Sequence, residues 1–302
     1  MKRVVSSSFV IALLAACGDA SGPAGSGDLD VSVAANEAVR VGFPHEEEAL
    51  GQTLEFIGGW SVQFDTFAVS IRTINLQEAT PDGDGPVIAS WDEPTVVDVA
   101  ASDTGEVELT TLTDVEEGRH DIKFRVAPPT AAASSADSEL LQRMQDNAWS
   151  VVVRGTATPD NDDPEFDQPI TFDYGFDLDA EYFDCINGAD ETKGVVIAAN
   201  RRNQAYIYPH IVHLFWDTLG VGEEQLRFDP QARAAGEDNV VTLAELDTVD
   251  LLDPSLTDEN GVPLYDDAGL LDTYTLRAFL HRALAESFHF NGIGFCKKRL
   301  NR

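Results

Sequence analysis

The stretch Trp60-Ser-Val-Gln-Phe-Asp-Thr-Phe-Ala-Val-Ser-Ile71 decides the fold. Its apolar side chains alternate with polar ones up to Phe64 and resume one residue out of phase from Phe67. Strict alternation is typical of a strand with one buried face, and a slip of one residue is what a β-bulge produces. We therefore predict a long strand with a bulge at Asp65-Thr66.

Similar short segments follow this stretch at the spacing of a β-sandwich, and turn residues such as Pro81-Asp-Gly-Asp-Gly85 separate them. They predict a mainly β fold, an antiparallel β-sandwich over residues 38–200. Residues 201–302 change character to helices and loops, and we expect them to be a small helical C-terminal portion packed on the same domain. The best helix in this portion is predicted over 273–288, where apolar residues recur at helical spacing.

The N-terminus is typical of a secreted protein. A short basic segment, Met1-Lys-Arg3, precedes a mostly apolar run that ends in Leu14-Ala-Ala-Cys17, which predicts a signal peptide over 1–16. The last four residues resemble the lipobox of bacterial lipoproteins. This resemblance implies cleavage before Cys17 and a lipid on its sulfur, and two or more chains anchor a protein stably.

Residues 17–37 are rich in Gly, Ala, Ser and Asp, and we predict a flexible tether there. The expected location is the cell envelope, with the membrane contacted through the lipid anchor. Gly18 after the lipidated cysteine favours the outer membrane, facing the periplasm or the cell surface.

The formal net charge is −33. Such a surface repels nucleic acid and anionic lipid headgroups, so we expect no nucleic-acid partner. It also attracts cations without specificity, but solvation in a salty habitat is the explanation of the charge that we favour.

Two cysteines remain once Cys17 is assigned to lipid. In an oxidising compartment Cys185 and Cys296 are expected to form a disulfide. The alternative is that the two thiolates are soft ligands for copper or zinc.

The segment Tyr206-Ile-Tyr-Pro-His-Ile-Val-His-Leu-Phe-Trp-Asp217 contains candidate metal ligands. If Pro209 begins a helix, His210, His213 and Asp217 share one face, and both residue types ligate zinc and copper. The same pattern fits the solvated face of an amphipathic helix, and a strand would separate the two histidines. His289 is a further candidate ligand, because a disulfide at Cys296 would bring it back toward the sheet.

A second set of candidate ligands resembles a calcium loop. Glu245 fits its last position, with Asp238 and Thr242 at earlier ones. Ala234 and Gly236 occupy two positions that should carry carboxylates, so we interpret this as a degenerate loop and expect no calcium.

Five motifs in this order resemble a group of uncharacterised lipoproteins from myxobacteria and related bacteria. They are the Trp60–Ile71 stretch, Arg119-His-Asp-Ile-Lys-Phe-Arg-Val126, the His210–Asp217 segment, Val241-Thr-Leu-Ala-Glu-Leu246, and His289 followed by Cys296.

More distantly, the order of elements is similar to the methanobactin-associated periplasmic copper-binding family (MbnP). That resemblance implies a β-sandwich that binds copper through histidines, here His210, His213 and His289. It also implies a modified tryptophan, either Trp60 or Trp216. The chain departs from the lipoprotein group at the calcium-like loop and at Phe295, where that group has histidine.

The sequence contains no Gly-x-Ser-x-Gly, His-Glu-x-x-His or phosphate-loop motif, and we do not expect an enzyme. Two hypotheses remain. The first is a lipid-anchored envelope protein that binds or handles copper or zinc through His210 and His213. The second is a metal-free envelope lipoprotein that contacts another envelope protein.

Overall fold

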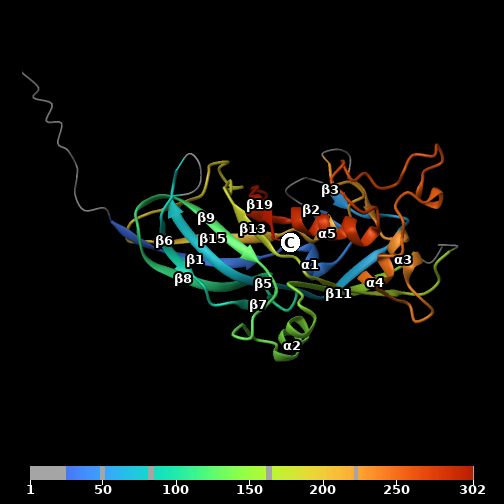
Figure 1. Ribbon diagram of the computed structural model, residues 1–302, viewed down its shortest axis with the longest axis horizontal. Helices are drawn as coiled ribbons and strands as arrows, with labels where there is room; N and C mark the ends of the chain where they lie inside the picture. Colours follow the sequence, from blue (N-terminus) through green and yellow to red (C-terminus); the bar gives the residue numbers. More distant parts are fainter. Residues whose placement is uncertain (1–24, 48–51, 81–84, 161–164, 221–223, 302) are drawn as a thin grey trace, which may run out of the picture.

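The computed structural model describes residues 25–47, 52–80, 85–160, 165–220 and 224–301. Two sheets dominate them, and the mainly β, sandwich-like fold agrees with the prediction (Figure 1). The four-stranded sheet has the spatial order β18 (Phe288–Phe290), β15 (Arg202–Pro209), β1 (Ser26–Ala34) and β8 (Glu106–Glu116).

The larger sheet has eleven strands. Its main path runs through β17 (Val240–Thr242), β12 (Ile170–Phe176), β11 (Val151–Thr158), β5 (Ser61–Glu78), β9 (Gly118–Val126), β13 (Ala180–Phe183) and β19 (Lys297–Leu300). The strands off this path are β6 (Val87–Trp91), β7 (Thr95–Asp98), β10 (Ser134–Ser135) and β14 (Val195–Ile197). Two small ribbons pair β16 (Leu226–Arg227) with β4 (Phe56–Ile57), and β2 (His45–Glu47) with β3 (Gln52–Leu54).

The helices are short and lie mostly in the C-terminal third. They are α1 (Ala38–Val41), α2 (Ser138–Asn147), η1 (Ile211–Phe215), α3 (Asp229–Ala234), α4 (Leu243–Leu246), η2 (Pro254–Leu256) and α5 (Leu276–Glu286), where η marks a 3-10 helix. In Figure 1, α3 and α4 lie at the end of the molecule opposite β6 and β8. The predicted helix over 273–288 corresponds to α5, which begins three residues later, after the N-cap residue Thr275.

The bulge predicted in the long strand is confirmed. Arg154 of β11 pairs with Thr66 of β5, whereas its neighbour Gly155 pairs with Phe64. Asp65 is therefore the extra residue, and the apolar side chains on both sides of it face the same core. Phe67, Val69 and Ile71 are fully buried as a result.

The predicted boundary of the tether, residues 17–37, is wrong for its second half. Residues 26–34 form β1, a central strand of the four-stranded sheet, in which Leu29, Val31 and Val33 are fully buried. The sheets are also less uniform than predicted, because β1 pairs in parallel with β15 and β12 in parallel with β17. Strands from residues 201–302 thus complete both sheets, so this portion is an integral part of the sandwich.

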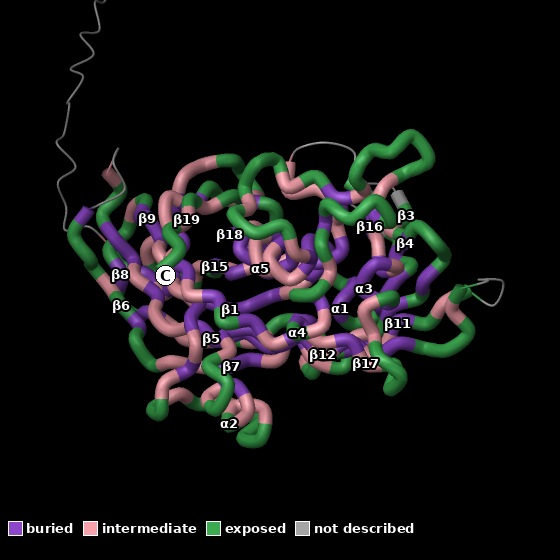
Figure 2. The backbone as a smooth tube through the Cα atoms, turned by 45° about the vertical axis from the view of Figure 1, so that its right-hand side comes forward, coloured by how far each residue is buried: buried purple, intermediate pink, exposed green. Residues whose placement is uncertain are grey.

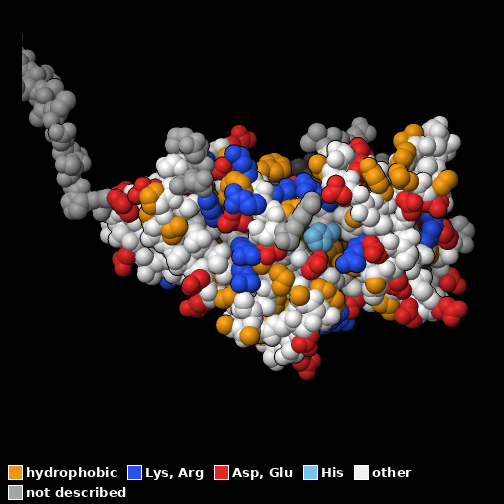
Figure 3. Space-filling model, in the orientation of Figure 1, with side chains coloured by type: hydrophobic (Ala, Val, Ile, Leu, Met, Phe, Trp, Pro, Cys, Tyr) orange, Lys and Arg blue, Asp and Glu red, His pale blue; other side chains and the backbone are white. Residues whose placement is uncertain are grey.

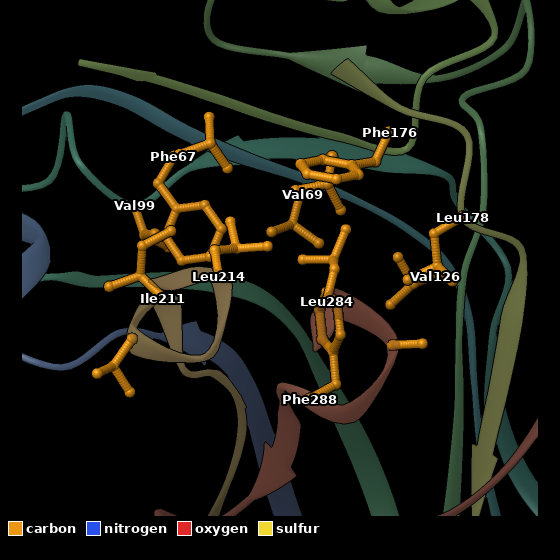
Figure 4. Packing of buried hydrophobic residues seen from close by; sticks show 14 of the residues in the cluster. Phe67, Val69, Val99, Val126, Phe176, Leu178, Ile211, Leu214, Leu284 and Phe288 are labelled. Atoms are coloured by element: carbon orange, nitrogen blue, oxygen red, sulfur yellow. The ribbon is translucent and has the colours of Figure 1, made fainter. Parts of the chain in front are cut away.

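The core lies between the sheets and the C-terminal elements (Figure 2), where buried stretches run along β1, β5 and β11. Ile211 and Leu214 of η1 lie close to Phe67 of β5 (Figure 4). Leu284 of α5 lies against the same sheet, near Val69 of β5 and Phe176 of β12. These contacts fix η1 and α5 on the inner face of the large sheet.

The surface in Figure 3 carries acidic side chains over most of its extent, with Lys and Arg gathered over β9, β13 and β19. In that region Arg125 forms a two-bond ion pair with Asp179, and Arg299 pairs with Glu181. Within the described residues, none of the helices is both long and apolar enough to cross a membrane.

Candidate metal centre

The segment that was expected to form a helix from Pro209 contains the end of a strand and a short 3-10 helix. Pro209 ends β15, and a 3-10 helix of only five residues, η1, follows His210. Trp216 then returns to an extended conformation, so Asp217 does not share a helical face with the histidines. The prediction of one face carrying His210, His213 and Asp217 is therefore wrong for Asp217.

The three histidines nevertheless converge. The ring centres of His210 and His289 are 4.5 Å apart, those of His213 and His289 are 5.3 Å apart, and those of His210 and His213 are 5.9 Å apart. The pairing of β15 with β18 causes this, because Tyr208 lies opposite His289 in the register. The backbone N–H of His210 also donates to the carbonyl of Ser287 at 2.9 Å, which joins the start of η1 to the start of β18.

The turn after β18 sets the orientation of His210. Nε2 of His210 lies 3.0 Å from the carbonyl oxygen of Gly292. A carbonyl only accepts, so Nε2 carries the proton and Nδ1 of the neutral ring carries the lone pair. Gly292 has a φ of +91°, a conformation that favours glycine, and so this turn depends on the residue type at 292.

His213 and His289 are buried and held neutral. Burial lowers the pKa of His213 to about 2, and the neighbouring imidazoles act in the same direction. Burial also lowers the pKa of His289 to about 4, with a smaller contribution from His210, while the backbone at Ile293 and Glu286 opposes the shift. Both rings therefore present lone pairs at neutral pH, as metal ligands must.

His289 has unsatisfied hydrogen-bonding capacity. Among the described residues, neither of its ring nitrogens has a hydrogen bond of normal geometry, although the residue is only 5% exposed. Leaving such a group unpaired costs on the order of 1–3 kcal/mol. A buried imidazole without hydrogen bonds calls for an explanation, and a functional role such as binding an ion is one.

The three rings do not yet form a metal site. In the described part of the chain, no group of three or more His, Cys, Asp or Glu side chains has the arrangement of a metal centre. The three rings are close to one another, with ring centres 4.5 to 5.9 Å apart.

The carboxylate of Asp217 forms an ion pair and a backbone hydrogen bond away from the histidines. Its Oδ2 accepts from Nε of Arg227 at 2.7 Å, and its Oδ1 accepts from the backbone N–H of Gln225 at 3.1 Å. Both carboxylate oxygens thus hold β16 and the residue before it against the segment that follows η1. This contact explains the acidic residue at 217 without a metal.

The predicted disulfide between Cys185 and Cys296 is present. The backbone N–H of Ile186 also donates to the carbonyl of Phe295 at 2.7 Å, so the segment after His289 is fixed to the end of β13. The alternative that both thiolates ligate copper or zinc is excluded for this oxidised form, since a disulfide sulfur is not a thiolate.

The two tryptophans occupy different surroundings. The indole of Trp216 packs on His213, with ring centres 3.9 Å apart. Trp60 is buried elsewhere in the core, and its Nε1 donates to Asp229 Oδ1 at 2.6 Å. Of the two, Trp216 is the one that adjoins the histidines.

The calcium-like loop lies between the two short helices α3 and α4. Glu245 Oε2 accepts from the backbone N–H and the hydroxyl of Thr242, at 2.7 and 2.9 Å. Asp238 Oδ1 accepts from the backbone N–H of Val240 at 3.1 Å. These three side chains satisfy backbone groups at the start of β17 and of α4, which is a structural use of the motif.

Sequence reasoning missed three features of the site: the Gly292 carbonyl, the Trp216–His213 contact and the placing of Phe295 against His289, with ring centres 4.9 Å apart. The Asn291-Gly292 pair was a turn signal, but its carbonyl direction was not readable. Cys17 lies outside the described residues.

No family model, curated protein or solved structure matches the chain. The resemblance to the myxobacterial lipoproteins and to the MbnP family therefore stays a prediction that these comparisons do not test.

Proposed function

We propose that the protein binds one copper ion through His210, His213 and His289, with zinc as the weaker competitor. The observation that carries the proposal is the convergence of three imidazoles from two separate strand–turn segments. In the described structure two of them are buried neutral, and His289 lacks normal hydrogen bonds.

The spacing supports this proposal. Imidazoles that share one metal ion at about 2.0–2.1 Å have ring centres roughly 5 Å apart. The observed separations of 4.5, 5.3 and 5.9 Å lie around that value. The change required is rotation of side chains, and His289 has no normal hydrogen bond among described residues to lose on rotating.

The ligand chemistry favours copper over zinc and disfavours harder ions. Three neutral imidazoles without a carboxylate suit copper and zinc, and copper binds more tightly in the Irving–Williams order. The contact from the Gly292 carbonyl to His210 is the kind of outer-shell hydrogen bond that fixes a metal-ligating histidine.

Equilibrium dialysis against copper and zinc tests the proposal. Because a protein of charge −33 collects cations without specificity, the buffer contains excess Mg²⁺ and about 0.15 M salt. We expect one tightly bound copper, lost in the His210→Ala/His213→Ala variant and kept in the control His281→Ala, whose ring pairs with Asp177 at the surface. No stoichiometric copper, or unchanged binding in the double variant, would refute the metal centre.

We further propose that the protein is a lipid-anchored envelope protein. The lipobox-like Leu14-Ala-Ala-Cys17 supports this, and β1 of the described sandwich begins nine residues after Cys17, at Ser26. We expect the wild type in the membrane fraction and Cys17→Ser in the soluble fraction, with mass spectrometry showing a diacylglyceryl group on Cys17. An unmodified Cys17 thiol in the mature protein would contradict this anchor.

A further inference from the structure

A cavity of about 430 Å³ opens beside the histidines. His213 and His289 form part of its wall, together with the apolar side chains of Trp216 and Leu219. Phe295 stands at its edge and is 70% exposed, so the cavity is reached from solvent past an aromatic ring. Its size and mostly apolar wall are those of a small-molecule site.

His289 gives this cavity a polar group that needs a partner. Both of its ring nitrogens lack a normal hydrogen bond among the described residues, and the side chain lines the cavity. The neutral ring of His289 has one N–H and one lone-pair nitrogen. When no metal ion is bound, a hydrogen-bond donor in the cavity would satisfy the lone-pair nitrogen.

The charges around the cavity favour a neutral ligand. The carboxylate of Glu286 is part of the wall, but Arg282 binds it at 2.8 Å and Lys298 binds its other oxygen. That carboxylate is thus already neutralised, while the net charge of −33 disfavours an anion. A second carboxylate on the wall, Glu224, is exposed to solvent and also disfavours an anion. The features that can recognise a neutral ligand are the aromatic faces and the buried acceptor nitrogen of His289.

We propose that this cavity binds a small neutral aromatic molecule that carries one hydrogen-bond donor, of the phenol or azole class. Its ring packs against Trp216 and Phe295, and its O–H or N–H donates to the unprotonated nitrogen of His289. The site goes beyond the metal centre, since it requires no metal ion.

The probe pair 4-fluorophenol and fluorobenzene tests it by ¹⁹F NMR titration of the purified protein in EDTA. We expect the phenol to bind about fivefold to tenfold more tightly than fluorobenzene, because only the phenol donates a hydrogen bond. His289→Phe should reduce this ratio to about one, and the matched variant His281→Phe should leave it unchanged.

Phe295→Ala provides a test that does not touch the histidine. The side chain of Phe295 is exposed, so the fold should tolerate the change. We expect the affinity of both probes to fall by about threefold or more, because each loses an aromatic contact. Equal affinity for the two probes, or binding unaffected by Phe295→Ala and His289→Phe, overturns the proposal. Since EDTA is present throughout, failure of copper binding leaves this result unaffected, and failure here leaves the copper titration unaffected.

Discussion

His289 shows at the scale of a single residue how a site can oppose stability. Its ring is buried, and its nitrogens lack normal hydrogen bonds in the described structure, whereas an apolar ring of similar shape would have no such cost. We predict that His289→Phe raises the free energy of unfolding of the metal-free protein by about 1–2 kcal/mol and weakens copper binding without abolishing it, because two imidazoles remain. Urea unfolding in EDTA measures the first effect. If His289→Phe instead lowered the free energy of unfolding by more than about 1 kcal/mol, the imidazole would have to make stabilising hydrogen bonds in the folded protein.

The lowered pKa values of His213 and His289 predict a pH dependence of stability. The unfolded chain binds protons on these rings below about pH 6.5, whereas the folded protein binds them on His289 only near pH 4 and on His213 near pH 2. The unfolded state therefore gains protons first, and stability falls as the pH decreases from about 6.5 to about 4. The expected loss is on the order of 3 kcal/mol for each imidazole.

Unfolding curves of the metal-free protein between pH 7.5 and 4.5 measure this loss, because most carboxylates stay ionised in that range. His289→Phe should show a smaller decrease than the wild type, since one titrating ring is gone. A wild-type stability that stays flat from pH 7 to 4.5 would show that the rings are not held neutral.

Residue patterns predicted the site unevenly. His210 and His213 were recognisable as a close pair, and His289 was placed near them through the expected disulfide, which is present. Asp217 does not share a helical face with the histidines, because η1 ends at Phe215. Its carboxylate binds Arg227, a contact between residues brought together by the pairing of Trp216 with Leu226. The ion-pair partner of an acidic residue is a tertiary property and is not visible in local spacing.

At the scale of elements, the disulfide holds the segment that follows β18. It joins Cys185 after β13 to Cys296 before β19, across 111 residues of sequence. Closing a loop of that length is worth about 4–5 kcal/mol in the chain-entropy model. We predict that Cys185→Ala/Cys296→Ala loses roughly this amount in urea unfolding and weakens copper binding, because the segment that follows the Gly292 turn then loses its covalent link to the end of β13. Unchanged copper affinity in the double variant would show that the turn positions His210 without the disulfide.

Phe295, between β18 and β19, is a position at which a fourth metal ligand can be added. Its ring adjoins His289 and lines the same cavity as His213. We predict that Phe295→His adds a fourth imidazole and tightens copper binding about tenfold or more, measured by competition with a chelator of known affinity. Phe295→Ala is the control and should not tighten it. Weaker binding in Phe295→His than in Phe295→Ala would place the metal away from this edge of the cavity.

The elements themselves were predictable where the pattern was local. The phase slip at Asp65 gave the bulge, and apolar spacing gave α5. Residues 26–34 alternate as clearly as any strand, but the Gly- and Ser-rich sequence before them masked the signal. The expected helix at 209–217 shrank to η1 because Pro209 is the last residue of β15, paired with Phe288, rather than a helix start.

At the scale of the molecule, the chain closes on itself through its C-terminal third. β15 and β18 complete the four-stranded sheet, and β17 and β19 extend the large one. The pairing of β15 with β18 brings His210, His213 and His289 together. The antiparallel pairing of β15 with β18 is a long-range choice that no single segment encodes. The β class was thus predictable from local alternation, while the site required the assembled sheets.

X-ray absorption spectroscopy of the copper-loaded protein tests the central claim most directly. We predict a first shell of three imidazole nitrogens at about 2.0 Å, with one imidazole fewer in His289→Phe and no change in His281→Ala. A shell of oxygen ligands alone, or the same imidazole count in both variants, would contradict a copper centre formed by His210, His213 and His289.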